Sequence, residues 1–252
     1  MLERRYQAER AKWDAVAAAK AARLKPVAPG DNFQRYAARA STMVGINEFL
    51  GDLHGKKVLE IGCGLGELSV LLAKSGAQVT AFDLSPVSVA TARMRSQLNQ
   101  VEEAVDLVVA PGESLPFEDE SFDVVFGKAI LHHLDVRLGC HDLCRVLKTG
   151  GKAAFVEPMG MNPLLNFVRE CVPYPHKNPR GEDRPLTYDE IHAWGQGYQH
   201  FRYREIHLLT MLERGLGFNK RLKPLRRLDD ILLGRFPFLR RYCRYVVLYM
   251  IK

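Results

Sequence analysis

Short apolar runs alternate with longer amphipathic segments through the first 160 residues of this 252-residue chain. Five runs have the length and side-chain types of buried strands, at 56–62, 77–83, 104–110, 122–128 and 151–157. Three helix-like segments separate them, at 66–75, 86–99 and 136–147. This alternation favours right-handed crossovers, and therefore an α/β fold with a parallel sheet and helices on both faces.

Capping signals support several boundaries. Ser85 followed by Pro86 is typical of a helix start, with a hydroxyl cap and a proline in the first turn. Thr187 and Glu190 have the spacing of a capping box and predict a further helix. The pair Gly150–Gly151 predicts the end of the helix that precedes the fifth strand.

The pattern loosens after the fifth strand. Residues 158–186 are rich in proline, asparagine and arginine and predict a helix with a long loop. Two further strands are expected within 201–212 and 244–252. The first 25 residues are charged throughout and predict a helix that faces solvent or docks on another surface.

Three glycines follow the first strand in the stretch "EIGCGLG", residues 60–66. Ligands bind to open parallel sheets beyond the carboxyl ends of the strands, and glycine lets a ligand approach the backbone there. Asp83 ends the second strand, where a carboxylate can bind ribose hydroxyls. The spacing is G-x-G-x-G, whereas a dinucleotide fold has G-x-G-x-x-G, which counts against a nicotinamide-dependent dehydrogenase.

Together with "FDLS", "ESLPFEDESFDVVFGKAILHHLD" and "LKTGGKAAFVEP", this loop resembles the class I S-adenosylmethionine-dependent methyltransferases over about residues 45–160. The small-molecule, ubiquinone-type branch is the most similar. The resemblance implies a doubly wound, mostly parallel seven-stranded sheet of Rossmann-like type, with an antiparallel seventh strand. It also implies a methyltransferase domain at 45–252 after a helical extension at 1–44, with cover segments at 158–200 and 213–241.

The resemblance assigns S-adenosylmethionine as cofactor, with S-adenosylhomocysteine as product. Its expected contacts are Glu60, Gly62, Cys63, Gly64, Gly66, Asp83, Leu84, Gly112, Glu113 and Lys128. The family often has aspartate where this chain has Pro111, so we expect an adenine that is bound more weakly or anchored differently, but not lost.

Methyl transfer from a sulfonium is an in-line displacement, in which alignment and desolvation supply most of the acceleration. A base is needed only where the acceptor must lose a proton. His133 is the first candidate, followed by His132 and by Glu157 at the end of the fifth strand.

The formal charge of +7 is concentrated at the carboxyl end, because residues 201–252 carry 13 Lys/Arg and 4 Asp/Glu. The basic segments are expected to cover the methyl acceptor, with contacts from Tyr36, Asn162, Arg169, Tyr174, His176 and Arg180. Three interpretations of this charge stay open. They are a solvated face, a pocket for an anionic or amphiphilic molecule, and attachment to an anionic membrane surface.

The composition of the chain argues against several other classes of protein. No apolar run approaches the roughly 20 residues of a membrane span, and the N-terminus lacks the apolar core of a secretory signal, so we expect a cytoplasmic protein, with peripheral membrane contact left open. Five scattered cysteines make no disulfide framework, and Cys140 and Cys144 fit a helix better than a metal site, so no metal is expected. Nucleic acid is also not expected, because no stacking array or binding module accompanies the basic residues.

The sequence therefore predicts transfer of a methyl group from S-adenosylmethionine to a small, anionic or amphiphilic molecule. The alternative is a non-catalytic cofactor-binding or scaffold protein whose site has drifted, with Pro111 as its motivation. The acceptor atom and the oligomeric state stay open, including a homo-oligomer formed through the N-terminal helix.

Overall fold

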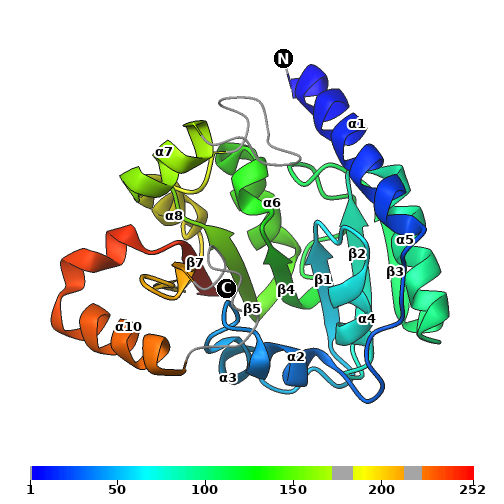
Figure 1. The fold of residues 1–252 in the computed structure, drawn as a ribbon. Helices are drawn as coiled ribbons and strands as arrows, with labels where there is room; N and C mark the ends of the chain where they lie inside the picture. The colour runs from blue at the N-terminus through cyan, green and yellow to red at the C-terminus, as the bar shows by residue number, and fades with distance from the viewer. Residues whose placement is uncertain (1, 172–183, 213–222) are drawn as a thin grey trace.

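The computed structural model describes residues 2–171, 184–212 and 223–252. Its seven strands form one sheet in the order β3-β2-β1-β4-β5-β7-β6 (Figure 1). The strands are β1 Lys57–Ile61, β2 Gln78–Asp83, β3 Val105–Val109, β4 Phe122–Lys128, β5 Leu147–Pro158, β6 His200–Ile206 and β7 Tyr245–Ile251. The pairs among β1 to β5 are parallel, and β7 is antiparallel to both of its neighbours. The expected doubly wound, mostly parallel sheet is confirmed.

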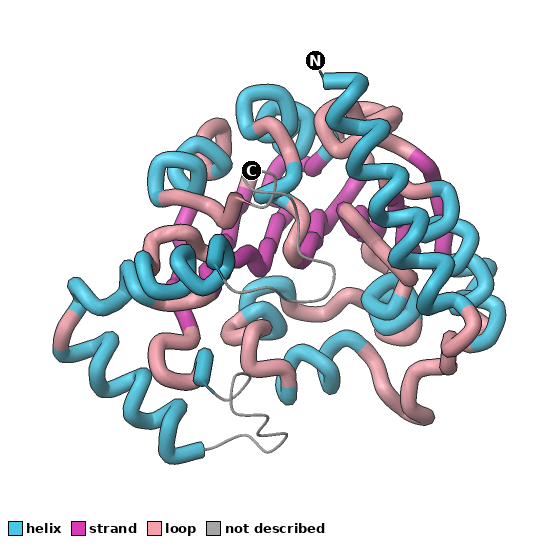
Figure 2. The backbone as a smooth tube through the Cα atoms, turned by 45° about the horizontal axis from the view of Figure 1, so that its top comes forward, coloured by secondary structure: helices cyan, strands magenta, loops and turns pink. Residues whose placement is uncertain are grey.

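Helices cover both faces of this sheet (Figure 2). They are α1 Leu2–Ala21, α2 Phe33–Arg39, α3 Ile46–Leu50, α4 Glu67–Ala73, α5 Pro86–Leu98, α6 Val136–Val146, α7 Pro163–Cys171, α8 Tyr188–Trp194 and α10 Lys223–Arg235, with short 3-10 turns η1 Glu102–Ala104, η2 Leu131–His133 and η3 Pro237–Tyr242. The Ser85 hydroxyl caps α5 by accepting from the Ser88 amide at 2.9 Å. Both halves of the capping box predicted for Thr187 and Glu190 are present at the start of α8.

Side chains that alternate along each strand divide the core into two layers. Val58 and Ala154 belong to a cluster that packs against α2, α3, α4 and α5. Their neighbours Leu59 and Phe155 belong to the cluster on the opposite face, where α6 and α8 pack. All four are fully buried, as is Trp194 of α8 at 1% exposure. The strands are hydrophobic on both faces because both faces are covered.

The expected helix end at Gly150–Gly151 is wrong. Helix α6 ends at Val146, and β5 begins at once with Leu147, which is buried and pairs with Phe122 of β4. The regular register resumes only with Val124 opposite Lys152. The pair of glycines therefore lies inside the strand and accommodates an irregularity in its pairing, with Gly150 at φ +73°.

The segment 1–44, expected as a helical extension, contains α1 and α2 and packs against the rest of the chain. Phe33 of α2 and Met43 are buried in the main core, and the Phe33 ring contacts Phe126 of β4 with a centroid distance of 5.1 Å. Helix α1 packs along α5, with Ala17 only 1% exposed (Figure 1). The extension thus docks on its own chain.

The segment 213–241, expected to be part of the cover, is described from Lys223 onward. Helix α10 packs beside the edge strand β6, because the buried carboxylate of Asp229 accepts from the amides of Leu208, Leu209 and Thr210 at 2.7 to 3.2 Å. None of the described residues of this segment lines the cavity described below. Residues 213–222 lie outside the described ranges.

Within the described ranges, no helix combines the length and the apolar character that crossing a membrane requires.

We expect Gly66→Ala to lower the free energy of unfolding by about 2–4 kcal/mol. Gly66 has φ +74°, and an added Cβ would lie 2.7 Å from the Cβ of Ala92 on α5. Gly64→Ala is the matched control, because Gly64 has φ +51° but nothing lies within 4 Å of an added Cβ. The control should lose only about 1–2 kcal/mol in urea denaturation. Equal losses would show that contact with α5 does not matter.

Candidate active site

A glycine loop connects β1 to α4 and is fastened to the end of β2. Gly62 has φ +67°, and an added Cβ there would lie 2.7 Å from Cδ1 of Ile130. The Cys63 amide donates to the Phe82 carbonyl at 2.9 Å, and the Gly64 amide donates to Oδ2 of Asp83 at 2.9 Å. The loop is therefore held as a turn whose backbone faces the carboxyl edge of the sheet.

Asp83 is the polar centre of this edge. Its second oxygen, Oδ1, accepts from the Ser85 amide at 2.9 Å. Burial raises the pKa of Asp83, although its two backbone hydrogen bonds act in the opposite direction. Each carboxylate oxygen has lone pairs for more than one donor, so Asp83 can still accept from a ligand.

A cavity of about 250 Å³ opens beside Asp83, between the ends of β1, β2 and β4. Its walls are mostly apolar, with polar groups at a few points, as in sites for small molecules. The sequence-predicted residues that line it are Gly62, Asp83, Leu84, Gly112, Glu113, Lys128 and His133. Pro111 lines it as well, together with Phe82 and Ile130.

Four predicted cofactor contacts do not line this cavity, namely Glu60, Cys63, Gly64 and Gly66. Glu60 is 2% exposed and accepts from the hydroxyl of Ser69 on α4. Burial raises its pKa to about 8. The Cys63 side chain belongs to the apolar core, and burial raises the pKa of its thiol. The side chains of Glu60 and Cys63 thus stabilise the loop from the protein interior and do not face the cavity.

Helix α1 forms one wall of the cavity, through Tyr6, Glu9 and Trp13. The sequence predicted a helix that faces solvent or docks, but not this position, because charged residues lie on all sides of α1 and leave no apolar stripe. Tyr6, Glu9 and Trp13 are spaced by three and four residues, so they share one face of the helix. That spacing of two aromatic side chains was the available signal.

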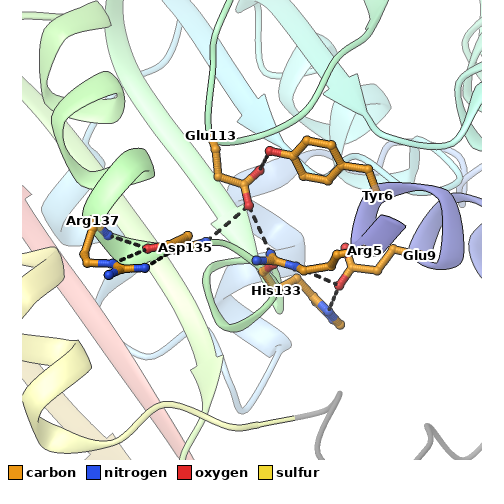
Figure 3. A network of polar contacts seen from close by, with 7 residues as sticks. All are labelled: Arg5, Tyr6, Glu9, Glu113, His133, Asp135 and Arg137. Atoms are coloured by element: carbon orange, nitrogen blue, oxygen red, sulfur yellow. Dashed lines mark hydrogen bonds and ion pairs between the residues drawn. The ribbon is translucent and has the colours of Figure 1, made fainter. Parts of the chain in front are cut away.

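Glu113 anchors α1 to the sheet (Figure 3). Its Oε1 accepts from Nη2 of Arg5 at 3.0 Å and from the Asp135 amide at 3.2 Å, while Oε2 accepts from the Tyr6 hydroxyl at 2.9 Å. Arg5 also donates to the backbone carbonyl of His133. Burial, reinforced by the bond to Glu113, raises the pKa of Tyr6. The carboxylate of Glu113 is thus shared among three donors of the protein itself.

The second attachment of α1 is Asp14, whose carboxylate accepts from the Ser85 hydroxyl and from the Val87 amide at 3.3 Å. Trp13, one residue before it, points its ring edge at His133, with centroids 5.9 Å apart and planes at 86°. The helix is therefore attached on both sides of the residues that line the cavity.

The three catalytic candidates occupy different positions. Glu157 is fully buried, and its Oε1 accepts from the amides of Ile130 and Leu131 at 2.9 and 3.0 Å. Its Oε2 lies 2.7 Å from Nδ1 of His132. Glu157 and His132 thus brace the η2 turn from below, and neither lines the cavity next to Asp83.

His133 does line the cavity. Its Nδ1 lies 3.5 Å from Oε1 of Glu9, and it is buried without a hydrogen-bond partner among the described residues. A second cleft, of about 620 Å³, shares His133, Glu9 and Leu134 with the cavity. Its basic lining consists of Arg4, Arg5, Arg137, Arg184 and His132.

The predicted substrate contacts lie elsewhere. The Tyr36 hydroxyl is 3.2 Å from Nζ of Lys128 and holds that side chain at the cavity wall. Asn162 caps α7 by accepting from the Leu164 amide at 3.0 Å. Arg169 donates to the side chain of Asn166 at 2.9 Å. The other three, Tyr174, His176 and Arg180, fall outside the described residues.

Residues 59–155 match the family model described as a methyltransferase domain. They include the glycine loop, Asp83 and β1 to most of β5. Residues 59–155 are therefore similar to a methyltransferase domain, and the fold is that of the class I S-adenosylmethionine-dependent methyltransferases. The resemblance seen in the sequence is thereby confirmed, and the sheet order fits it.

Two curated relatives match part of this methyltransferase-like chain. It is 38% identical over 112 residues to a demethylmenaquinone methyltransferase of Chlorobaculum parvum, which covers 43% of this chain and 44% of the relative. It is 36% identical over 119 residues to a ubiquinone biosynthesis O-methyltransferase of Bordetella parapertussis, covering 47% and 48%. The chain therefore spans about half the length of the curated relatives it matches.

Solved structures share the class I fold at low sequence identity. A phosphoethanolamine N-methyltransferase 2 of Haemonchus contortus, in complex with S-adenosyl-L-methionine, has a TM-score of 0.61 at 20% identity, covering 84% of this chain and 52% of that one. A geranyl diphosphate C-methyltransferase of Streptomyces coelicolor has 0.59 at 17%, covering 81% and 74%. The cyclase SpnF has 0.59 at 18%, covering 96% and 93%. The fold alone thus does not fix the reaction.

We expect Glu60→Gln to flatten the pH dependence of stability of this methyltransferase-like domain. Burial raises the Glu60 pKa from its ordinary value of 4.5 to about 8. The folded state therefore keeps a proton that the unfolded chain releases. Stability from this group is complete below the lower pKa and is lost as pH rises through the higher one, by at most about 1.4 kcal/mol per pH unit.

Urea denaturation of the wild type and Glu60→Gln across that pH window measures this loss. The free energy of unfolding should fall faster with pH in the wild type. Parallel curves would contradict the assignment of a neutral, buried Glu60.

Glu113→Gln should loosen α1 from the class I core. The amide keeps the shape of the side chain but removes the charge that pairs with Arg5, and hydrogen bonds to charged groups contribute about 1.5–3 kcal/mol. Hydrogen exchange of the α1 amides should speed up by roughly tenfold or more. Glu103→Gln, at an exposed carboxylate of η1, is the matched control. Unchanged exchange in Glu113→Gln would show that the anchor lies elsewhere.

Proposed function

We propose that this protein transfers a methyl group from S-adenosylmethionine to a small molecule, leaving S-adenosylhomocysteine. The main support is Asp83, a largely buried carboxylate that two backbone amides hold at the cavity next to the glycine loop. Such a carboxylate at the end of the second strand suits the paired hydroxyls of a ribose. When bound, the cofactor would supply a methyl group on a sulfonium centre.

The residues present fit this cofactor. Leu84, Phe82 and Trp13 offer apolar surface for an adenine next to Asp83. The turn at Gly62, which has no room for a Cβ, offers backbone to the methionine part, and Lys128 lies at the same wall. Pro111 lines the cavity without a side-chain acceptor, so the adenine edge would be recognised by neighbouring backbone groups at Gly112.

The contribution of the protein to the reaction is alignment and exclusion of water. Helix α1 covers the cavity and separates it from solvent on one side. His133 is the proposed base for acceptors that lose a proton, because it is the histidine at the cavity. His132 and Glu157 are positioning residues in this proposal, since they hold the η2 turn from which His133 extends.

The proposed acceptor is anionic or amphiphilic, as the sequence suggested. The cleft that shares His133 with the cavity is lined by four arginines and by Glu9, Asp135 and Glu190. Arg5 and Arg137 pair with Glu113 and Asp135, so Arg4 and Arg184 are the arginines that we propose for a carboxylate or phosphate group of the acceptor. The names of the relatives and neighbours include quinone-biosynthetic, geranyl diphosphate and phosphoethanolamine methyltransferases, so amphiphilic and phosphate-bearing acceptors occur among similar proteins. A cytoplasmic site of action is part of the same proposal.

A non-catalytic cofactor-binding protein is the second candidate. Pro111 at the cavity favours this candidate. SpnF, which has a similar fold, is described as a cyclase and not as a methyltransferase. Homo-oligomerisation through α1 has no support, because α1 packs on its own chain.

Calorimetric titration of the full-length protein with S-adenosylhomocysteine tests the proposal. We expect micromolar binding in the wild type, weakened at least tenfold in Asp83→Ala, because one buried acceptor contributes about 1–3 kcal/mol. Asp106→Ala removes an exposed carboxylate of β3 and should bind as the wild type does.

Absence of binding in the folded wild type would reject the cofactor and with it the activity. Binding without methyl transfer to a panel of quinol, carboxylate and phosphate-bearing acceptors would favour the second candidate. A parallel titration with NAD is the control, because it tests whether the cavity binds a dinucleotide instead.

A further inference from the structure

Helix α7 is oriented with its polar side chains inward. None of its residues is buried, and the polar ones contact the backbone beneath it. Asn166 donates to the Gly160 carbonyl at 2.7 Å, and Arg169 donates to the side chain of Asn166. Leu164 and Phe167 are 64% and 61% exposed and lie on the outer face. A surface helix of a globular protein normally has the reverse arrangement.

Helix α10 shows the same reversal. Its buried residue is the charged Asp229, bound to three backbone amides near the end of β6, whereas Ile231 is 65% exposed. The η3 turn that follows adds Phe238 at 66% and Phe236 at 42% exposure. Both helices are therefore fastened in part by polar contacts, with Leu165 of α7 and Leu232 and Leu233 of α10 half-buried, and both present further apolar side chains outward.

These elements form one face, which we name the apolar–basic face. The side-chain amide of Asn162 at the start of α7 donates to the carbonyl of Tyr242 at the end of η3, at 2.7 Å. Both views place α7 and α10 on the side of the molecule opposite α1 (Figures 1 and 2). Its apolar members are Leu164, Phe167, Val168, Ile231, Phe236 and Phe238.

The charges on this face are mainly positive. Arg227, Arg235, Arg240 and Arg241 are exposed on α10 and η3. The acidic side chains of the same elements are Asp229, Asp230 and Glu170. Asp229 is buried and bonded, Asp230 lies 3.4 Å from Arg204, and Glu170 is at the far end of α7. Exposed apolar side chains among arginines are complementary to a bilayer interface with anionic headgroups.

We propose that the apolar–basic face docks on the surface of an anionic lipid bilayer. The phenylalanine, leucine and isoleucine side chains enter the boundary between headgroups and acyl chains, and the arginines pair with lipid phosphates. The segments that build it leave the sheet at Pro158 and Ile206, which both pair with Tyr245 at the carboxyl edge. The face therefore extends from the same edge as the cavity. This inference stands independently of the proposed activity.

Sedimentation of the full-length protein with vesicles tests the proposal. Binding is expected to vesicles that mix phosphatidylcholine with phosphatidylglycerol, and to be much weaker with phosphatidylcholine alone or at high salt. The double variant Phe167→Ser with Phe238→Ser should reduce the partition coefficient at least tenfold. The variant Arg240→Gln with Arg241→Gln should bind less and lose part of the salt dependence.

The matched control is Met94→Ser with Leu98→Ser, which removes two apolar side chains of α5 that are 51% and 52% exposed on the other side of the molecule. It should bind vesicles as the wild type does. The proposal is overturned by no vesicle binding, by equal binding to neutral vesicles, or by an equal loss in the control. A dimer in sedimentation equilibrium that the phenylalanine variant separates would also overturn it, and would make this face an interface between copies of the chain.

S-adenosylhomocysteine titration of each variant keeps the two proposals apart. All three variants should bind the cofactor product as the wild type does, since none of these residues lines the cavity. Loss of vesicle binding with unchanged titration is therefore a result about the face alone.

Discussion

A carboxyl group that leaves water must find hydrogen-bond partners, and this requirement organises the carboxyl edge of the sheet. Glu60 of β1 takes the hydroxyl of Ser69 on α4, and Asp83 of β2 takes two amides of the loops beside it. Glu113, beyond β3, takes Arg5 and Tyr6 of α1. Glu157 of β5 takes the amides that begin η2. Each acidic side chain thus fixes the loop or helix next to it, and the cavity is the space that these fixed parts leave.

Much of the fold follows from local patterns. Alternating strands and helices, the Ser85 cap and the Thr187 capping box each depend on residues close in sequence, so they could be predicted. Pairing between β4 and β5 could not, because the irregularity around Gly150 depends on where Leu147 finds a buried place against Phe122. The glycines looked like a helix end because both situations need a residue without a Cβ.

The site divides in the same way. Asp83 and the turn at Gly62 follow from strand ends and glycine spacing, and the sequence located both. Glu113 was expected to face a ligand, but its partners on α1 are separated from it by 107 and 108 residues. Helix α1 has no apolar stripe, and its docking depends on polar contacts whose partners no periodicity reveals. The exposure of the apolar side chains of α7 and α10 could not be predicted for a related reason. An amphipathic pattern does not indicate which face of a helix packs against the protein.

The attachment of α1 has a consequence for synthesis of the chain. Arg5 of α1 donates to the backbone carbonyl of His133, 128 positions later, so α1 can dock only after the ribosome has made β1 to β4. Contacts this distant in sequence form late and slowly. A fusion partner or tag joined before Leu2 would adjoin Arg4 and Arg5, which line the second cleft. One joined after Lys252 would follow the end of β7, where Ile251 pairs with Lys152, at the opposite edge of the sheet.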